Sequence, residues 1–335
     1  MRPKQLAILF VSLATLLTYM IVAQPAQASD DYEPLLLKAR TLLAENIPPL
    51  REQAKAGNSE AQLLIGLACA YGYGTDRDAT AAVDWYRKAA EGGNAAAANF
   101  LGIAYEDGVG VKKDLHQAEE WYRKAAEADD PHGQFDYGTM HGNEPEGKQW
   151  ILRAAEHGHR EAQAWMLSWF SDPKDAMAWL QKLVEKGDSS AEFLMGTIYD
   201  HRLSNSRLKK FVPQDDEEGM RWLRRAADHG DTEAQTWVGE MYSQGKGVPK
   251  DKSEAAKWYR KAADQGNPEA EHNLGYLYEH GEGVPKDKAA AAMWYHLARE
   301  AGDVQARLLG PMRINDEEDR QYHQQLEQWK REHHH

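Results

Sequence analysis

The sequence predicts an all-α protein, built as a solenoid of about seven helix-turn-helix repeats with capping helices at both ends. Three features carry this prediction: a tryptophan that recurs at a fixed step, an apolar stripe of helical period before it, and a glycine-rich segment between the two. A solenoid buries the apolar face of each repeat against the next, so its first and last units need caps.

The recurring tryptophan defines the repeat length. The letters WYRKA occur three times, and four further tryptophans continue the series. The step is 36 residues at both ends of the series, but 29 residues twice and 43 once in the middle. The middle repeats have therefore lost and then gained seven residues. The seven tryptophans are Trp85, Trp121, Trp150, Trp179, Trp222, Trp258 and Trp294.

Each repeat is predicted to contain two helices. In the second repeat, Ala97, Leu101 and Tyr105 recur every four residues and lie on one stripe of the first helix. In the second helix, Trp121 and its neighbouring alanines form the buried stripe. Cys69 occupies the same position as Tyr105 in its own repeat, so we expect a buried and inert thiol.

The segment GKGVPKD, residues 245–251, is predicted to be the hinge between the two helices. Glycine allows the positive φ that follows a helix C-terminus, and Asp251 stands where an N-cap belongs. The segment lacks the third glycine of a dinucleotide fingerprint and the Gly-Lys-Ser/Thr of a nucleotide P-loop. It also recurs at residues 72–78, 108–114 and 281–287, which favours architecture over phosphate binding.

The combined pattern A-x3-L-G-x2-Y-x2-G-x-G-V-x2-D-x3-A-x2-W-Y-x2-A resembles the Sel-one-like repeat (SLR) family, relatives of the tetratricopeptide repeats. The resemblance covers residues 54–298. It implies an α-solenoid that scaffolds protein complexes, frequently in the bacterial envelope, with no common catalytic residue. Some cysteine-rich members are linked to β-lactam binding, but this chain has one cysteine, so we do not extend that activity to it.

The two ends are expected to differ from the repeats. Residues 1–28 resemble a secretory signal, with Arg2 and Lys4 before an apolar run and a small-x-small site at its end. We expect cleavage after Ala28 and export to the periplasm or beyond; an uncleaved anchor is the alternative. Residues 29–53 are predicted to be N-terminal capping helices. Residues 299–335 are predicted to hold a partial repeat and a capping helix that packs through Tyr322, Leu326 and Trp329.

Charge and cysteine content exclude several functions. The net charge of -13 disfavours nucleic acid and anionic membranes, which require a basic surface. One cysteine allows neither an intramolecular disulfide nor a cysteine-based zinc site. His272 and His280 are about 12 Å apart along a helix, too far to share one ion. We therefore expect no enzyme activity, no cofactor and no metal site.

The first helices are expected to line a concave groove, as in tetratricopeptide solenoids. The groove positions lie opposite the buried stripe, one residue before its alanine and two, six, nine and ten residues after it. Rings and acids at these positions predict a partner-binding surface. For Phe135 and Phe193, completion of the core is the alternative. The predicted residues are Leu63, Leu67, Tyr71, Asn99, Ile103, Glu106, Asp107, Phe135, Thr139, Phe193, Asp200, His201, Glu240, His272, Tyr276, Glu279 and His280.

The enlarged fifth repeat provides a second candidate surface. Its inserted loop, residues 201–219, holds the most basic patch of an acidic chain. Long insertions in repeat arrays tend to be functional or mobile, and both possibilities stay open. The residues concerned are Arg202, Arg207, Lys209, Lys210 and Phe211.

These observations predict an exported, non-enzymatic solenoid that binds another protein as an envelope scaffold or adaptor. One alternative is an immunity protein that neutralises a secreted antibacterial effector, a role that some members of the family have. Another is an envelope hydrolase, which would need a convergent polar pocket that the sequence does not indicate.

Overall fold

The computed structural model describes residues 32–142, 144–201, 206–301 and 316–332, and these ranges fold into 18 helices without a strand. The prediction of an all-α solenoid is confirmed. The helices are α2 (Glu33–Arg40), α3 (Ile47–Lys55), α4 (Ser59–Tyr71), α5 (Ala79–Glu91), α6 (Ala95–Asp107), α7 (Leu115–Glu127), α8 (Pro131–His141), α9 (Pro145–Glu156), α10 (Arg160–Trp169), α11 (Pro173–Glu185), α12 (Ser189–Tyr199), α13 (Ser206–Phe211), α14 (Asp216–Asp228), α15 (Thr232–Gln244), α16 (Lys252–Asp264), α17 (Pro268–His280), α18 (Lys288–Ala301) and α20 (Asp316–Glu332).

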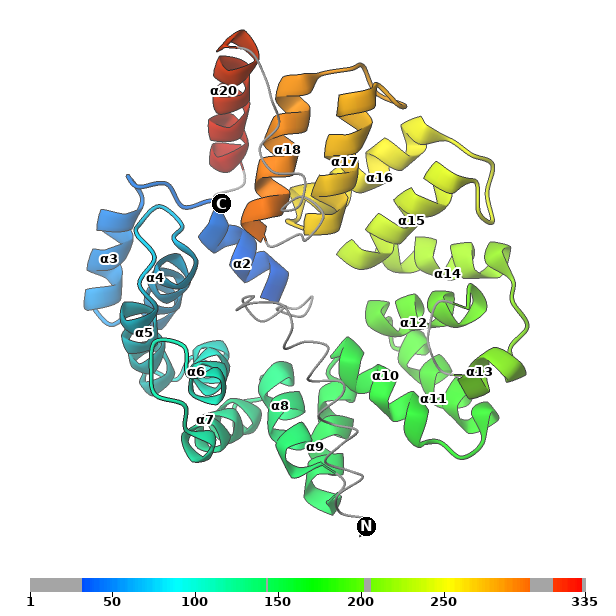
Figure 1. Ribbon diagram of the computed structural model, residues 1–335. Coiled ribbons are helices and arrows are strands. Elements are labelled where there is room, and N and C mark those ends of the chain that lie inside the picture. The colour runs from blue at the N-terminus through cyan, green and yellow to red at the C-terminus, as the bar shows by residue number, and fades with distance from the viewer. Residues whose placement is uncertain (1–31, 143, 202–205, 302–315, 333–335) are drawn as a thin grey trace, which may run out of the picture.

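The helices follow one another around a central opening and form a nearly closed ring (Figure 1). The first helices α6, α8 and α10 lie nearer this opening than the second helices α7, α9 and α11. The two ends of the solenoid meet, because the Tyr73 hydroxyl after α4 donates to the Glu300 carbonyl of α18 at 3.5 Å. We call the inner side of this ring the concave side.

The predicted hinge has the expected geometry. Gly245 follows α15 with φ 78°, and its N–H donates to the Met241 carbonyl at 2.8 Å. The Asp251 carboxylate then accepts from the N–H groups of Ser253 and Glu254 at 2.9 and 3.0 Å, as an N-cap of α16 should. The stretch that resembled a phosphate loop is thus a helix stop followed by a helix start.

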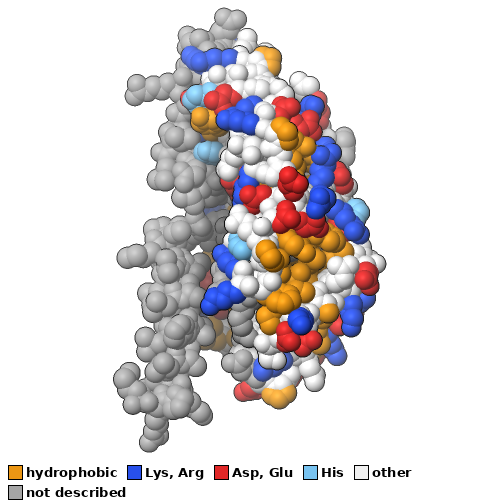
Figure 2. Space-filling view, turned by 90° about the vertical axis from the view of Figure 1, so that its right-hand side faces the viewer, with side chains coloured by type: hydrophobic (Ala, Val, Ile, Leu, Met, Phe, Trp, Pro, Cys, Tyr) orange, Lys and Arg blue, Asp and Glu red, His pale blue; other side chains and the backbone are white. Residues whose placement is uncertain are grey.

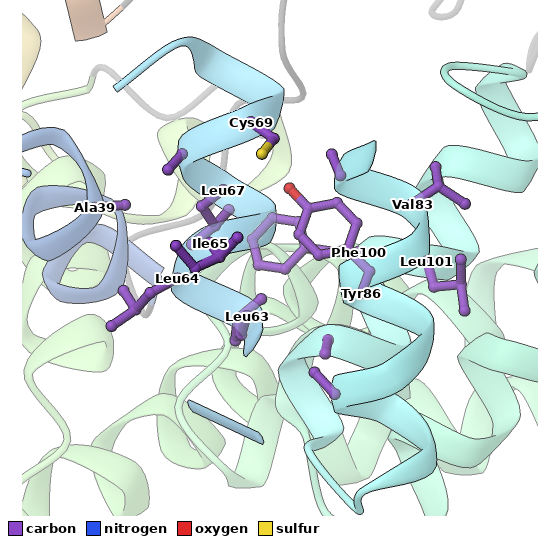
Figure 3. Packing of buried hydrophobic residues seen from close by; sticks show 14 of the residues in the cluster. Ala39, Leu63, Leu64, Ile65, Leu67, Cys69, Val83, Tyr86, Phe100 and Leu101 are labelled. Carbon is purple, nitrogen blue, oxygen red and sulfur yellow. The ribbon is translucent and has the colours of Figure 1, made fainter. Parts of the chain in front are cut away.

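Glycine in the first helix allows close packing of the second. A Cβ atom on Gly102 of α6 would lie 2.5 Å from the Tyr122 ring of α7, so no larger residue fits without displacement. The core continues between repeats: Figure 3 shows the Tyr86 ring of α5 and the Phe100 ring of α6 together, stacked at 5.5 Å. Trp258 and Cys69 are buried, as predicted.

The ends are more elaborate than simple caps. At the C-terminal end α20 packs on α18, with Trp329 and Trp294 edge to face at 6.1 Å. At the N-terminal end α3 packs on α4, whereas α2 lies on the concave side (Figure 1). The signal segment, residues 302–315, which include most of the predicted partial repeat, and residues 333–335 lie outside the described residues. Residues 299–301, where the partial repeat was expected to begin, are the end of α18. Within the described ranges, no helix has the length and apolar character needed to span a bilayer.

Candidate functional site

Helix α2 is held on the concave side by residues from several repeats. Lys38 forms an exposed ion pair of 2.8 Å with Glu60 at the start of α4. Tyr32, directly before the helix, contacts α6 and α8, and Arg40 at its end contacts α17, α18 and α20. Glu60, His132 and Glu271 all lie in the first turn of their helices. The N-terminal ends of the first helices therefore bind α2.

The Tyr32 side chain is enclosed by two rings and a carboxylate. Its ring stacks on Phe100 at a centroid distance of 4.9 Å and lies 4.0 Å from the His132 ring. Its hydroxyl donates to both Asp130 carboxylate oxygens at 2.9 Å. Asp130 also caps α8 by accepting from the Gly133 N–H at 2.8 Å. Burial raises the pKa of Tyr32 and that of Asp130.

Two buried histidines support this site. The His159 Nδ1 atom accepts from the Ala162 N–H at 3.2 Å and caps α10, so its proton lies on Nε2. That Nε2–H donates to His132 Nδ1 at 3.0 Å. Burial lowers the pKa of His132 to about 4 and, with His132 and Arg160 nearby, that of His159 to about 3. Both rings are therefore neutral near pH 7.

Arg40 is buried beside an equally buried acid. Its Nη1 and Nη2 donate to the two carboxylate oxygens of Glu271 at 3.1 and 2.5 Å. Nη1 also lies 3.4 Å from the Leu297 carbonyl, and the guanidinium lies 5.4 Å from the Trp329 ring. Such a two-pronged contact requires the planar fork of arginine. Arg40 thus links the beginning of the chain to three helices at its end.

Glu271, the partner of Arg40, lies at a position of the repeat that is usually glutamine. In four repeats this position is glutamine, whose amide donates to a backbone carbonyl eight residues earlier, at 2.9–3.4 Å. This hydrogen bond ties each of these first helices to the helix before it. In the fifth and seventh repeats it is Glu192 and Glu271, which cannot donate as carboxylates. The glutamines are Gln62, Gln134, Gln163 and Gln235.

Glu192 and Glu271 are paired by residues from different parts of the chain. Glu192 of α12 pairs with Arg225 at 2.6 Å and with His229 at 2.8 Å, both belonging to its own repeat. The residues at the corresponding positions of the seventh repeat, three and seven after its tryptophan, are Leu297 and Ala301. The seventh repeat therefore takes its guanidinium from α2.

The concave wall beside Tyr32 is acidic. Burial, with smaller contributions from Glu106, Glu161 and Asp130, raises the pKa of Asp136 in α8 to about 7 against the effect of a hydrogen bond from Asn99. Partial desolvation, together with the neighbouring Glu106, also raises the pKa of Asp107. Glu106 accepts from the Tyr122 hydroxyl at 2.6 Å, and Glu279 accepts from Tyr295 at 2.8 Å in the same way.

Several residues predicted to face an open groove are buried instead. Phe193 packs edge to face on Trp237 at 4.9 Å, and Phe135 does so on Trp165 at 5.5 Å. Both tryptophans belong to the first helix of the next repeat. Because the ring is tightly curved, that helix covers the residue that lies two positions after the alanine of the buried stripe. For the two phenylalanines the core alternative is therefore correct. The exposure predicted for Leu63, Leu67 and Asn99 is wrong.

Asp200 and His201 position the enlarged loop. Asp200 is buried and pairs with Lys246 of the next hinge at 3.3 Å, so its predicted place on an open surface is also wrong. His201 has φ 61°, and its Nε2 donates to the Val212 carbonyl at 2.8 Å. Lys246 also pairs with Asp216 inside the insertion at 3.5 Å, so these contacts hold the insertion against the ring.

The remaining predicted residues are at least partly accessible, and all except His272 lie on the second halves of the first helices. Asp107, Tyr276 and His280 are exposed, and the others are half-buried. Tyr276 stacks on His280 at 4.2 Å with 41% of its surface exposed. Their role in binding stays a prediction. The half-buried ones are Tyr71, Ile103, Glu106, Thr139, Glu240, His272 and Glu279.

The basic insertion forms a short helix on the outer side of the ring. Leu208 and Val212 anchor α13 in the core, while Lys210 and Phe211 are exposed and Lys209 is half-buried. Figure 1 places α13 at the outer edge, away from α2. Figure 2 views this side, where hydrophobic side chains gather between basic and acidic ones. Arg202 and the Arg207 side chain lie outside the described residues.

The residues that bind α2 were not predicted from the sequence, because residues 29–53 were expected only to cap the solenoid. A signal was present: Glu271 stands where four repeats carry a buried glutamine, which indicates a buried charge that needs a cation. Across the described part of the chain, no group of three or more His, Cys, Asp or Glu side chains could hold a metal ion.

Comparison with known proteins identifies the repeat. The Sel1 repeat matches residues 59–94, 95–130, 131–159, 170–188, 189–231, 232–267 and 268–303. No match was found among curated proteins. A Sel1 repeat protein from Oxalobacter formigenes is 31% identical over 84% of this chain and 87% of that chain, with a TM-score of 0.45.

Two further solved structures are similar. One is c5321, a protective antigen of uropathogenic Escherichia coli with an SLR fold, 26% identical, with a TM-score of 0.42. That match covers 87% of this chain but 66% of that one, so this chain spans about two thirds of its length. The immunity protein Pa5087 from Pseudomonas aeruginosa is 20% identical over 83% of this chain and 84% of that one, with a TM-score of 0.45. Because the matched repeats cover more than half of the sequence, the chain belongs to the Sel1 repeat family, whose members generally mediate protein binding and are usually not enzymes.

Proposed function

We propose that this protein is a non-enzymatic scaffold or adaptor that binds a partner protein on the concave side of its ring. The observation that carries this proposal is α2, a helix that precedes the first matched repeat and is held there by repeats 1, 2, 3 and 7. A surface that holds one helix through residue-specific contacts can hold a segment of another protein by the same means.

The partner is expected to contact the second halves of the first helices, which α2 leaves uncovered. Tyr276 is the large exposed ring at these positions, and interface hot spots are enriched in tyrosine. Glu279 and His280 lie one turn further along α17. This group offers an aromatic anchor beside a carboxylate.

Charge favours a basic partner segment. Glu106 and Asp107 lie at predicted groove positions of α6, and the whole chain has a net charge of -13. Complementary charge speeds association and selects among partners. We therefore expect binding to weaken as salt increases, because exposed charges are screened.

We also infer that the protein is exported and works in the envelope, on the basis of the signal pattern in residues 1–28. N-terminal sequencing of the protein recovered from the periplasm of its source cell tests this inference. A mature chain beginning at Ser29 agrees with it, and a chain that retains the apolar run contradicts it.

Site-specific photo-crosslinking tests the binding surface. A photoreactive phenylalanine analogue replaces Tyr276 in one variant and Phe211 in another, and each protein is irradiated in its native envelope extract. The two positions are matched, since 41% and 43% of their surfaces are exposed. We expect one dominant crosslinked protein from position 276 and none from position 211.

The crosslinked product also distinguishes the possible roles. An envelope component supports the adaptor, whereas an antibacterial effector supports the immunity alternative. Crosslinks from position 211 alone would transfer the binding surface to the outer insertion and contradict the proposal.

A further inference from the structure

Resting on the proposed function, we propose that the concave side binds an arginine side chain of the partner protein, between the Asp136 carboxylate of α8 and the Trp165 ring of α10. The two residues lie at equivalent positions of neighbouring first helices, three residues after Gly133 and Ala162. Both helices lie beside the central opening of the ring (Figure 1). A side chain that approaches from the concave side can therefore contact both.

Asp136 is an acid at a position of the repeat where five of the other six residues are leucine or aromatic. It is half-buried, and the charged groups that act on it, Glu106, Glu161 and Asp130, are all acids. Within the described ranges, no ion pair joins it to a Lys, Arg or His side chain. A partly buried carboxylate in such surroundings is stabilised by a cation, which the partner supplies. The equivalent residues are Leu64, Phe100, Trp165, Leu194, Trp237 and Asn273.

The buried Asn99 side chain faces the same carboxylate. Its amide donates to Asp136, whereas its Oδ1 atom has no hydrogen-bond partner among the described residues, although only 1% of the residue is exposed. In the next repeat the equivalent contact is made by two rings, Phe135 and Trp165. A buried amide oxygen without a donor lowers stability, so packing gives no reason for a polar pair here. A local departure of this kind indicates a site for a ligand.

Trp165 provides an accessible aromatic face beside this acid. It is 45% exposed, and Phe135 packs edge to face with it at 5.5 Å, which fixes the orientation of the ring. Met140, one turn after Asp136, is 37% exposed, and Glu161, one turn before Trp165, is also exposed. Helices α8 and α10 thus each present an acid and a large apolar side chain on one face.

These groups match an arginine side chain. A guanidinium stacks its face on an aromatic ring while the N–H groups at its edge pair with carboxylates, and its methylene stem covers apolar surface. Trp165 and Met140 offer the ring and the apolar surface, and Asp136 and Glu161 offer the carboxylates. The ammonium of lysine is attracted by the same acids but has no flat face to stack. The site therefore selects arginine over lysine, and either of them over a neutral side chain.

Nuclear magnetic resonance with a minimal probe tests this chemistry on the full chain. N-acetylarginine amide is titrated into the protein at pH 8, and the indole N–H signal of Trp165 and the methyl signal of Met140 report its binding. The matched probes are N-acetyllysine amide and N-acetylcitrulline amide, which has the shape of the arginine probe without its charge. We expect saturable shifts with arginine, binding of lysine that is weaker by at least about threefold, and no saturable shift with citrulline.

Variants of the protein separate binding from stability. Asp136→Asn keeps an acceptor for Asn99 but removes the charge, so affinity for the arginine probe should fall by at least about tenfold while the melting temperature at pH 8 stays the same or rises. The control Asp175→Asn removes an exposed charge from α11 on the outer side, and should change the affinity by less than about twofold. Should Asp136→Asn fail to fold, the exposed Glu161→Gln gives the second test, with an expected loss of at least about threefold.

The binding should also depend on pH. Burial and the neighbouring acids raise the pKa of Asp136 to about 7, so most of it is carboxylate at pH 8 and neutral acid at pH 6. Because a guanidinium pairs with the carboxylate, affinity for the arginine probe should fall by at least about fivefold from pH 8 to pH 6, but by less than about twofold in Asp136→Asn. Tyr32 and the nearby His132 stay neutral over this range, since burial raises the pKa of the first and lowers that of the second to about 4. The charged and titratable groups that face Asp136 are Tyr32, Glu106, Asp130 and Glu161.

Three results with the probes and variants would overturn the proposal. The arginine and citrulline probes could cause the same shifts, or the affinity could survive in Asp136→Asn. A dimer seen by light scattering that dissociates in this variant would assign the arginine to a second copy of the chain instead of a partner protein.

The crosslink at position 276 connects the site to the partner itself. Asp136→Asn in the same protein should reduce the crosslinked product by at least about threefold, because the partner loses one of its charged contacts. An undiminished product would overturn this inference and leave the proposed function intact.

Discussion

The Arg40–Glu271 ion pair offers a sharp test of how the ring is closed. Replacement of Arg40 by methionine keeps an unbranched apolar stem but removes the charged guanidinium, so Glu271 stays buried without it. Breaking a buried pair in this way costs about 3–5 kcal/mol. The control Lys38→Met removes an exposed pair from the same helix, which should cost about 0–1 kcal/mol.

A second substitution should restore most of the loss. Glu271→Gln introduces the residue that four other repeats carry at this position, where Gln235, for example, donates to the Ala227 carbonyl at 3.1 Å. The corresponding acceptor is the Ala263 carbonyl. The double variant Arg40→Met, Glu271→Gln leaves no charge at these two positions, so we expect it to recover at least half of the stability lost in Arg40→Met.

Urea unfolding followed by circular dichroism at pH 7 measures all four proteins. The reasoning would fail if Arg40→Met were no more costly than Lys38→Met, or if the double variant were no more stable than Arg40→Met alone. Either result would mean that the buried Glu271 carboxylate does not depend on the Arg40 guanidinium of α2.

Three further predictions concern the core and the buried histidines. Trp258→Ala should cost about 3–5 kcal/mol and the cap variant Asp251→Ala about 1 kcal/mol in urea unfolding; the reverse order would contradict the hinge. A bulky thiol reagent should label native Cys69 far more slowly than unfolded protein, since the thiol is buried and burial raises its pKa; equal rates would contradict its burial. Because burial lowers the pKa of His132 to about 4, the unfolded chain binds an extra proton below about pH 6.5, so this histidine should reduce the free energy of unfolding by about 2 kcal/mol from pH 7 to pH 5. His132→Asn should lessen this acid sensitivity, and an unchanged pH profile would exclude the depressed pKa.

The sequence by itself determined the repeat, the two helices within it and the hinge between them. These features depend on contacts that are local or separated by one repeat, so their period appears directly in the spacing of Trp121, Trp258 and the hinge glycines. Burial of Cys69 followed from the same alignment of repeats. The family resemblance added its general role in protein binding, which the comparisons support.

Only the tertiary structure decided which parts of the first helices remain accessible and what occupies the concave side. Small rotations between repeats add up to a nearly closed ring, which buries Phe135 and Phe193 under the next repeat. The same closure brings Arg40 to Glu271 across 231 residues of sequence. Periodicity describes one repeat and its neighbour, whereas curvature accumulates over all seven, so a contact between the two ends leaves no spacing that could be recognised in the sequence.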